Sequence, residues 1–140
     1  MESHHIEFTT NSSEFDLQMI ADYLSTKSYW AKGRTLDTIK RSIEGSLSFG
    51  ILKNGKQIGF ARVITDTATY YYLCDLFIIA EECGKGYGKQ LTHYIVTHPD
   101  LKGCRGALLT ADAHGLYSQY GFEADPEIAT KYMTRKAENI

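Results

Sequence analysis

Three glycines at alternate positions, Gly84, Gly86 and Gly88, make up the segment of this sequence best suited to hold a ligand. Glycine allows the main chain to turn sharply and to come close to a bound group. An apolar run at residues 76–80 precedes the glycines, and a helix-like stretch at residues 89–97 follows them. The first N–H groups of such a helix have no partner within it and lie at the positive end of its dipole. A strand, a glycine loop and a helix in this order predict a site for a phosphate or a pyrophosphate.

Two well-known phosphate-binding loops do not match this segment. A Walker A loop ends in Gly-Lys followed by Ser or Thr, whereas here Gln90 follows Gly88 and Lys89. The dinucleotide fingerprint needs a third glycine at position 89 or 91, where this chain has Lys89 and Leu91. Neither kind of nucleotide site is therefore indicated. A plain strand-to-helix turn stays open as the alternative to a ligand site.

A single carboxylate, Asp75, interrupts the β-rich and almost continuously apolar stretch at residues 69–80. A buried carboxylate costs several kcal/mol unless it is paired or hydrated. Its position therefore indicates either an open site beside it, where it would act as a general base, or a salt bridge. Arg62, on the preceding predicted strand, is the expected partner for a salt bridge.

The hydrophobic periodicity predicts which elements position these residues. Asn54-Gly55 is the clearest hairpin signal in the chain. The order is β-α-α-β-β-β-α-β-α-β, which favours one mixed sheet of about six strands with helices on both faces. Strands are expected near residues 4–10, 47–52, 58–65, 69–80, 107–110 and 132–135, and helices near residues 12–24, 35–44, 86–97 and 112–120.

The composition is typical of one globular domain spanning residues 1–140. The formal net charge of −2 predicts no attraction to nucleic acid or to a membrane surface. No apolar run approaches the length of a membrane span, and the first residues lack the apolar stretch of a secretion signal, so we expect a cytoplasmic protein. The three cysteines have no Cys-x-x-Cys spacing, and no metal site is predicted.

The glycine loop resembles motif A of the GNAT superfamily of acyl-CoA-dependent N-acetyltransferases, written Arg/Gln-x-x-Gly-x-Gly/Ala. Gly86 and Gly88 take the glycine positions, and Cys83 stands where the family has Arg or Gln. Residues 116–122, Leu-Tyr-Ser-Gln-Tyr-Gly-Phe, are similar to the family's Leu-Tyr-x-x-x-Gly-Phe. Thr110 lies seven residues before Tyr117, where the family often has Asn. Further segments, residues 28–31, 59–63 and 112–117, look like one group of small bacterial GNAT proteins, so the resemblance covers about residues 6–135.

The resemblance implies an α/β (α+β) GNAT-like fold, with a mixed and mostly antiparallel sheet, in agreement with the predicted order of elements. It implies acetyl-CoA as cosubstrate, with the pyrophosphate on the loop and the pantetheine arm paired with the strand before it. The expected cofactor-binding residues are Leu76, Phe77, Ile78, Cys83, Gly84, Lys85, Gly86, Tyr87, Gly88, Lys89, Thr110 and His114.

The resemblance also assigns roles in the transfer of an acetyl group. Tyr117 takes the position that is often the general acid in GNAT enzymes, and Asp75 is the candidate base. Tyr29 and Trp30 fall in the region that lines the acceptor side, where aromatic rings could enclose an amine by cation–π contact. Packing over the core is the alternative role for both rings.

The predicted function is therefore direct transfer of an acetyl group from acetyl-CoA to the amine of a small molecule or a peptide. A catalytically inactive acyl-CoA-binding sensor or scaffold is the alternative, and the cysteine at position 83 favours it. An enzyme that acetylates a protein N-terminus or a lysine side chain differs only in the size of its acceptor. GNAT proteins often dimerise, so both a monomer and a homodimer stay open.

Overall fold

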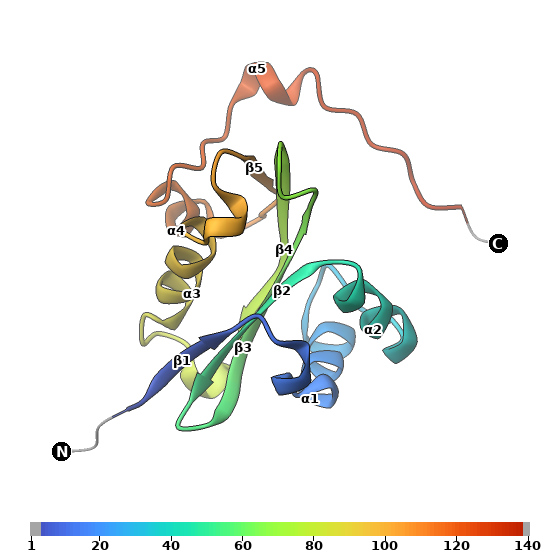
Figure 1. The fold of residues 1–140 in the computed structure, drawn as a ribbon. Helices are drawn as coiled ribbons and strands as arrows, with labels where there is room; N and C mark the ends of the chain where they lie inside the picture. Colours follow the sequence, from blue (N-terminus) through green and yellow to red (C-terminus); the bar gives the residue numbers. More distant parts are fainter. Residues whose placement is uncertain (1–3, 139–140) are drawn as a thin grey trace. The chain divides into compact units, whose positions relative to one another are not determined.

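The chain divides into two units, Met1–Leu109 and Thr110–Ile140, and each is described by itself. The structure is a computed structural model that describes residues 4–138 (Figure 1). The first unit contains the sheet and the glycine loop. The second unit contains Tyr117 and the residues around it.

The first unit is built on one five-stranded sheet whose strands follow the order of the chain. The strands are β1 (Ile6–Thr9), β2 (Leu47–Lys53), β3 (Lys56–Thr65), β4 (Tyr70–Ile78) and β5 (Arg105–Leu108). The strands β1 to β4 pair antiparallel with one another, and β5 pairs in parallel with β4. The mixed, mostly antiparallel sheet predicted from the sequence is confirmed. The hairpin at Asn54-Gly55 joins β2 to β3, with both residues at positive φ.

The sixth strand predicted at residues 132–135 is wrong. Five strands are found among residues 4–138, and residues 132–135 belong to none of them. Tyr132 and Met133, the two large apolar residues of this range, are both exposed. A strand pattern needs a face to bury its apolar side chains, and this segment buries neither of them.

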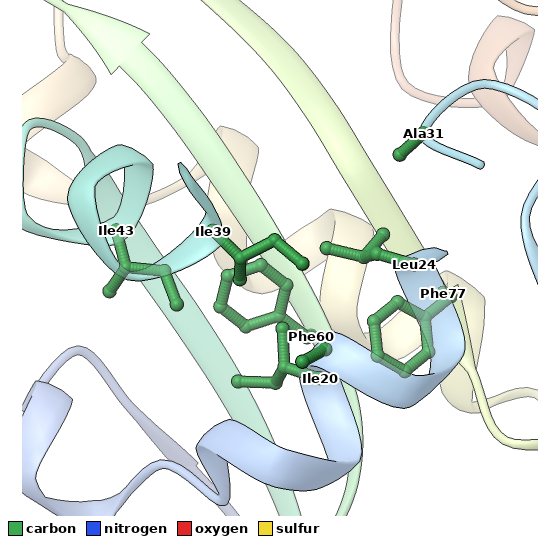
Figure 2. Packing of buried hydrophobic residues seen from close by; sticks show 8 residues of the cluster. Ile20, Leu24, Ala31, Ile39, Ile43, Phe60 and Phe77 are labelled. Atoms are coloured by element: carbon green, nitrogen blue, oxygen red, sulfur yellow. The ribbon is translucent and has the colours of Figure 1, made fainter. Parts of the chain in front are cut away.

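Two helices cover one face of the sheet. Helix α1 (Leu17–Asp22) begins where the Asp16 carboxylate accepts the Met19 N–H, and it continues as a wider turn over Tyr23–Lys27. Helix α2 (Leu36–Glu44) is capped by Thr35. Figure 2 shows the apolar side chains of both helices converging on aromatic rings of β3 and β4. The cluster consists of Ile20, Ala21, Leu24, Ala31, Ile39, Ile43, Phe60 and Phe77.

Helix α3 (Tyr87–Val96) covers the opposite face of the sheet (Figure 1). Its Tyr94 ring stacks on Phe8 of β1, with centroids 4.6 Å apart, and meets Phe49 of β2 edge-on. Leu91 and Ile95 on the same helix are fully buried. Burial of each such aliphatic side chain stabilises the fold by about 1.5–3 kcal/mol. This packing anchors the helix whose first turn follows the glycine loop.

A β-bulge interrupts β4 near its middle. Phe60 pairs with Phe77 and Arg62 with Cys74, so two residues of β4, Asp75 and Leu76, oppose one residue of β3. Asp75 adopts φ of 56°, which is rare for a residue other than glycine. Such bulges redirect side chains and end strand pairing. On the other side, pairing with β5 extends only as far as Leu73, just before the bulge.

The second unit contains two short helices, α4 (His114–Ser118) and α5 (Pro126–Ala129). The helix predicted at residues 112–120 is thus present but shorter. Gly121 has φ of 90°, which ends the helical turn that runs through residues 117–121. None of the helices described here is long and apolar enough to cross a membrane.

Candidate active site

The glycine loop forms an open cradle at the start of α3. Gly84 and Gly86 both adopt the left-handed conformation, with φ of 79° and 87°, and a Cβ added at either would meet nothing within 4 Å. Gly86 is the N-cap residue of α3 and has no side chain that could satisfy the first N–H groups. The loop therefore presents main-chain donors and the positive end of a ten-residue helix to a ligand.

An ion-pair network lies beside this loop. The Glu82 carboxylate accepts hydrogen bonds from Lys53 Nζ at 2.8 and 3.1 Å and from Lys85 Nζ at 2.8 Å. The hydrogen bond from Lys53, followed by that from Lys85, lowers the pKa of Glu82 to about 2. The Glu82 hydrogen bond in turn raises the pKa of Lys53. Two ammonium groups share one carboxylate, so the network of Lys53, Glu82 and Lys85 carries one net positive charge.

The sequence did not indicate Lys53 or Glu82 as a pair. The two residues are 29 positions apart, and Lys53 ends β2 of the hairpin. Nothing in their local sequence distinguishes them from solvated surface charges. The Lys53 Nζ also lies 5.5 Å from the centroid of the Tyr87 ring, which is buried in the first turn of α3. The network therefore ties the end of β2 to the loop.

Cys83 turns back towards the sheet. Its Sγ donates to the carbonyl oxygen of Ile78 at 3.4 Å, although the residue as a whole is exposed. A thiol in this position adds no charge for a phosphate. Recognition of an anion here falls to main-chain N–H groups and to the neighbouring lysines.

Residues 76–78 form the end of β4 and have a free edge. Ile79, directly after the strand, donates its N–H to Ile58 of β3, and Phe77 stacks on Tyr23 with ring centroids 3.9 Å apart. On the other side of β4, pairing with β5 ends at Leu73. Among the described residues no strand continues beside residues 76–78 on that side. An extended ligand could pair with this edge as an added strand.

Asp75 lies at the centre of a buried polar cluster. Its Oδ1 accepts from Trp30 Nε1 at 2.9 Å, and its Oδ2 accepts from Arg34 Nη1 and Arg62 Nε, each at 2.9 Å. The salt bridge with Arg62, which was the alternative to a catalytic base, is present in the structure. Arg34 is a second partner that sequence reasoning missed. The one feature of the sequence that could have indicated Arg34 is its position four residues after Trp30 in the same loop.

The aromatic pair predicted to line the acceptor side lies next to this cluster. Tyr29 and Trp30 meet edge-on, with ring centroids 5.1 Å apart, and both are exposed. The hydrogen bond to Asp75 fixes the plane of the Trp30 ring. The structure thus joins three of the predicted site residues, Tyr29, Trp30 and Asp75, in one place. Their roles in catalysis and binding stay predictions.

Lys89 lies in the first turn of α3, and three further predicted site residues belong to the second unit. Thr110 accepts the Ala113 N–H at 3.0 Å through its hydroxyl, just before α4 begins at His114. Tyr117 is the fourth of the five residues of α4, and its ring meets Phe122 edge-on, with centroids 6.0 Å apart. Thr110, His114 and Tyr117 are therefore grouped around one short helix. Their assignment to the cofactor and to proton transfer stays a prediction.

Comparisons with known proteins agree with this geometry. A family model described as an acetyltransferase (GNAT) domain matches residues 44–124. The solved structure of a candidate GNAT-family acetyltransferase from Xanthomonas campestris pv. campestris is 42% identical. It superposes with a TM-score of 0.90, covering 95% of this chain and 94% of that one.

Two more distant relatives were also found. A curated candidate acetyltransferase of Gibberella zeae is 28% identical; the match covers 65% of this chain but spans only 63% of that relative's length. An aminoglycoside N-acetyltransferase solved in complex with CoA is 20% identical, with a TM-score of 0.69 over 96% of this chain and 97% of that one. At this identity the likeness shows a shared fold.

Proposed function

This chain belongs to the GNAT family of acetyltransferases, and from that premise we propose that it moves the acetyl group of acetyl-CoA directly to a primary amine. The observation that carries the proposal is the glycine cradle at the start of α3, next to the free edge of β4. A protein of the same fold was solved with CoA, which supports the choice of cofactor.

The cradle fits the phosphates of the cofactor. The space that a Cβ would occupy at Gly84 and Gly86 is open, so a phosphate can approach the main chain there. Lys85 and Lys53 supply the positive charge that Cys83 does not. Residues 76–78 would pair with the pantetheine arm, and an N–H at Phe77 or Ile78 would polarise the thioester carbonyl.

In the proposed reaction the amine nitrogen bonds to the carbonyl carbon of the thioester, and the carbon–sulfur bond breaks. Acetyl-CoA supplies the activated acetyl group. Tyr117 would donate its phenolic proton to the departing sulfur, and a base would take the proton that the amine loses. Asp75 is the candidate base, and the two guanidinium groups on its carboxylate also support a positioning role towards Trp30. No acyl-enzyme is required.

The acceptor would be a small-molecule or peptide amine that lies against Tyr29 and Trp30. Both rings are exposed and held edge-on, so a cation or a neutral amine can approach their faces.

A catalytically inactive acyl-CoA-binding module is the second candidate. The observation that favours it is Cys83, which stands at a phosphate-side position and directs its thiol to the Ile78 carbonyl. Such a module would bind acetyl-CoA through the same cradle but release no CoA when amines are added.

The test is a calorimetric titration with acetyl-CoA, CoA and ATP, followed by an assay of thiol release with a panel of amines. We expect micromolar binding of acetyl-CoA and CoA, no binding of ATP, and amine-dependent release of CoA. Binding without release across the panel would favour the inactive module. The absence of acetyl-CoA binding would overturn both candidates.

A further inference from the structure

We propose that Arg34 binds an anionic group, a carboxylate or a phosphate, of the acceptor amine. The inference rests on the proposed function, because it names the class of amine that the site would select. It concerns the cluster formed by Asp75, Arg62, Arg34 and the aromatic pair Tyr29 and Trp30, all of which belong to the first unit.

The charges in this cluster do not balance. The Asp75 side chain is 2% exposed and pairs with two guanidinium groups, each through its Oδ2 atom. Arg62 alone would neutralise the carboxylate, and its Nη1 also donates to the Ser46 hydroxyl at 3.0 Å. Arg34 therefore adds a positive charge beyond what the carboxylate needs. An unneutralised charge in a partly buried place is costly unless an anion or water meets it.

Arg34 is the accessible member of the cluster. Its side chain is 24% exposed, against 12% for Arg62. Within residues 4–138 the structure gives the Arg34 side chain one hydrogen bond, from Nη1 to Asp75. The guanidinium group is a planar fork of five N–H donors that matches a carboxylate or a phosphate with two parallel hydrogen bonds. Arg34 thus retains donors for a ligand while Asp75 fixes its orientation.

The main chain around Arg34 is also held in place. The Arg34 carbonyl accepts from the Ser25 hydroxyl, and its N–H donates to Ala31 at 3.1 Å. The neighbouring Gly33 donates to the Ser25 carbonyl at 2.9 Å. A loop ordered in advance loses little conformational entropy when a ligand binds. Such preorganisation is what a specificity site needs.

The cluster is next to the place proposed for acetyl transfer. Asp75 directly precedes residues 76–78, the strand end that would hold the pantetheine arm. A strand rises about 3.3 Å per residue, so the three residues from Asp75 to Ile78 span at most about 10 Å, and the bulge at Asp75 shortens this span. A small acceptor could therefore place its anion on Arg34 and its amine at the thioester. The exposed rings of Tyr29 and Trp30 would contact the part between.

The experiment compares amines that differ only in an anionic group. The carboxylate pairs are lysine with lysinamide and glycylglycine with glycylglycinamide, and the phosphate pair is phosphoethanolamine with ethanolamine. We expect the wild type to favour the anionic member of at least one pair in kcat/KM. Arg34→Gln should lower kcat/KM for that member by about 10- to 100-fold and leave its uncharged counterpart within about twofold. The pair that responds identifies the anion.

Three comparisons make the outcome specific. Arg41→Gln removes an exposed guanidinium of α2, so it should leave the preference unchanged. Arg34→Lys keeps the positive charge but loses the planar pair of N–H donors, so it should retain part of the preference for the anionic amine. Unchanged acetyl-CoA affinity in each variant shows that the fold is intact.

Calorimetric binding of the same pairs to the CoA-loaded protein tests the inference separately from catalysis. Anion-dependent binding that Arg34→Gln abolishes, without turnover of any amine, would refute the proposed enzyme but support the anion site. Equal binding and equal turnover of both members of every pair would overturn the inference. A preference that persists in full in Arg34→Gln would overturn it as well.

Discussion

The indole N–H of Trp30 donates a 2.9 Å hydrogen bond to the buried carboxylate of Asp75, although the two residues are 45 positions apart in sequence. This bond connects an exposed aromatic loop to the bulge of β4. It means that the proposed acceptor surface and the strand beside the proposed thioester site are parts of one hydrogen-bonded cluster. A substitution at either residue should therefore alter the position of the other side chain.

Asp75→Asn should destabilise the protein strongly. The substitution leaves the guanidinium groups of Arg34 and Arg62 without their counter-charge, and loss of one partner from a buried pair costs about 3 kcal/mol or more. Urea denaturation measures this change in the free energy of unfolding. Asp37→Asn, which removes an exposed carboxylate 3.9 Å from Arg41, is the control and should change stability by less than about 1 kcal/mol. Similar losses in the free energy of unfolding for both variants would contradict a stabilising role of the cluster.

The kinetics of Asp75→Asn and Trp30→Phe separate two roles of Asp75. If Asp75 is the base, Asp75→Asn lowers kcat by about 100-fold or more, and Trp30→Phe has little effect on kcat. If Asp75 orients Trp30, both variants raise KM for the acceptor by similar factors, because each removes the same hydrogen bond. We expect the second pattern, since three donors already occupy the carboxylate. Dependence of kcat on pH provides a further readout.

Gly86→Ala should weaken acetyl-CoA binding by about tenfold or more, since the new methyl group occupies the open side of the cradle. It should also cost about 1–2 kcal/mol of stability, because Gly86 has φ of 87°. Gly103→Ala is a matched control: φ there is 83°, and nothing lies within 4 Å of an added Cβ. Denaturation should show that the two variants are destabilised equally. Calorimetry should show a loss of acetyl-CoA affinity only in Gly86→Ala. Equal affinities would remove the cradle from the cofactor site.

Glu82→Gln should make the free energy of unfolding depend less on pH in the acid range. The pKa of Glu82 is about 2 in the folded protein, below its ordinary value of 4.5, mainly because Lys53 donates to it. The unfolded chain therefore takes up this proton first as pH falls. The contribution of Glu82 is present above about pH 5 and is lost between about pH 5 and 2. Denaturation across this range should show a steeper loss in the wild type than in Glu82→Gln, while the exposed Glu81→Gln should follow the wild type.

Tyr117→Phe should lower kcat by about 100-fold and leave acetyl-CoA affinity nearly unchanged, because the substitution removes only the phenolic hydroxyl that would protonate the departing sulfur. The ring, which meets Phe122 edge-on, stays in place. Tyr120→Phe, three residues later, removes a similar hydroxyl and should retain most of the activity. Steady-state rates of CoA release measure both variants. An unchanged rate in Tyr117→Phe would exclude it as the acid.

The local elements of the site were predictable from the sequence. The glycine loop, the start of α3 and the hairpin at Asn54-Gly55 depend on backbone preferences of a few adjacent residues, which are visible in the chain itself. Asp75 was visible as the one carboxylate in an apolar stretch, whereas the β-bulge at this residue was not predicted. The expected strand at residues 132–135 was wrong, because the residue types of a short segment do not tell whether a face exists to bury them.

The sequence by itself determined the order of the elements as far as α4, the turns of the glycine loop and the type of residue at each proposed site position. Only the tertiary structure decided which charges meet. Arg34 reaches Asp75 across 41 residues, and Lys53 reaches Glu82 across 29. Such pairs depend on strand register, on the bulge at Asp75 and on how a loop packs over the sheet. These are long-range properties, and no local pattern of residue types encodes them.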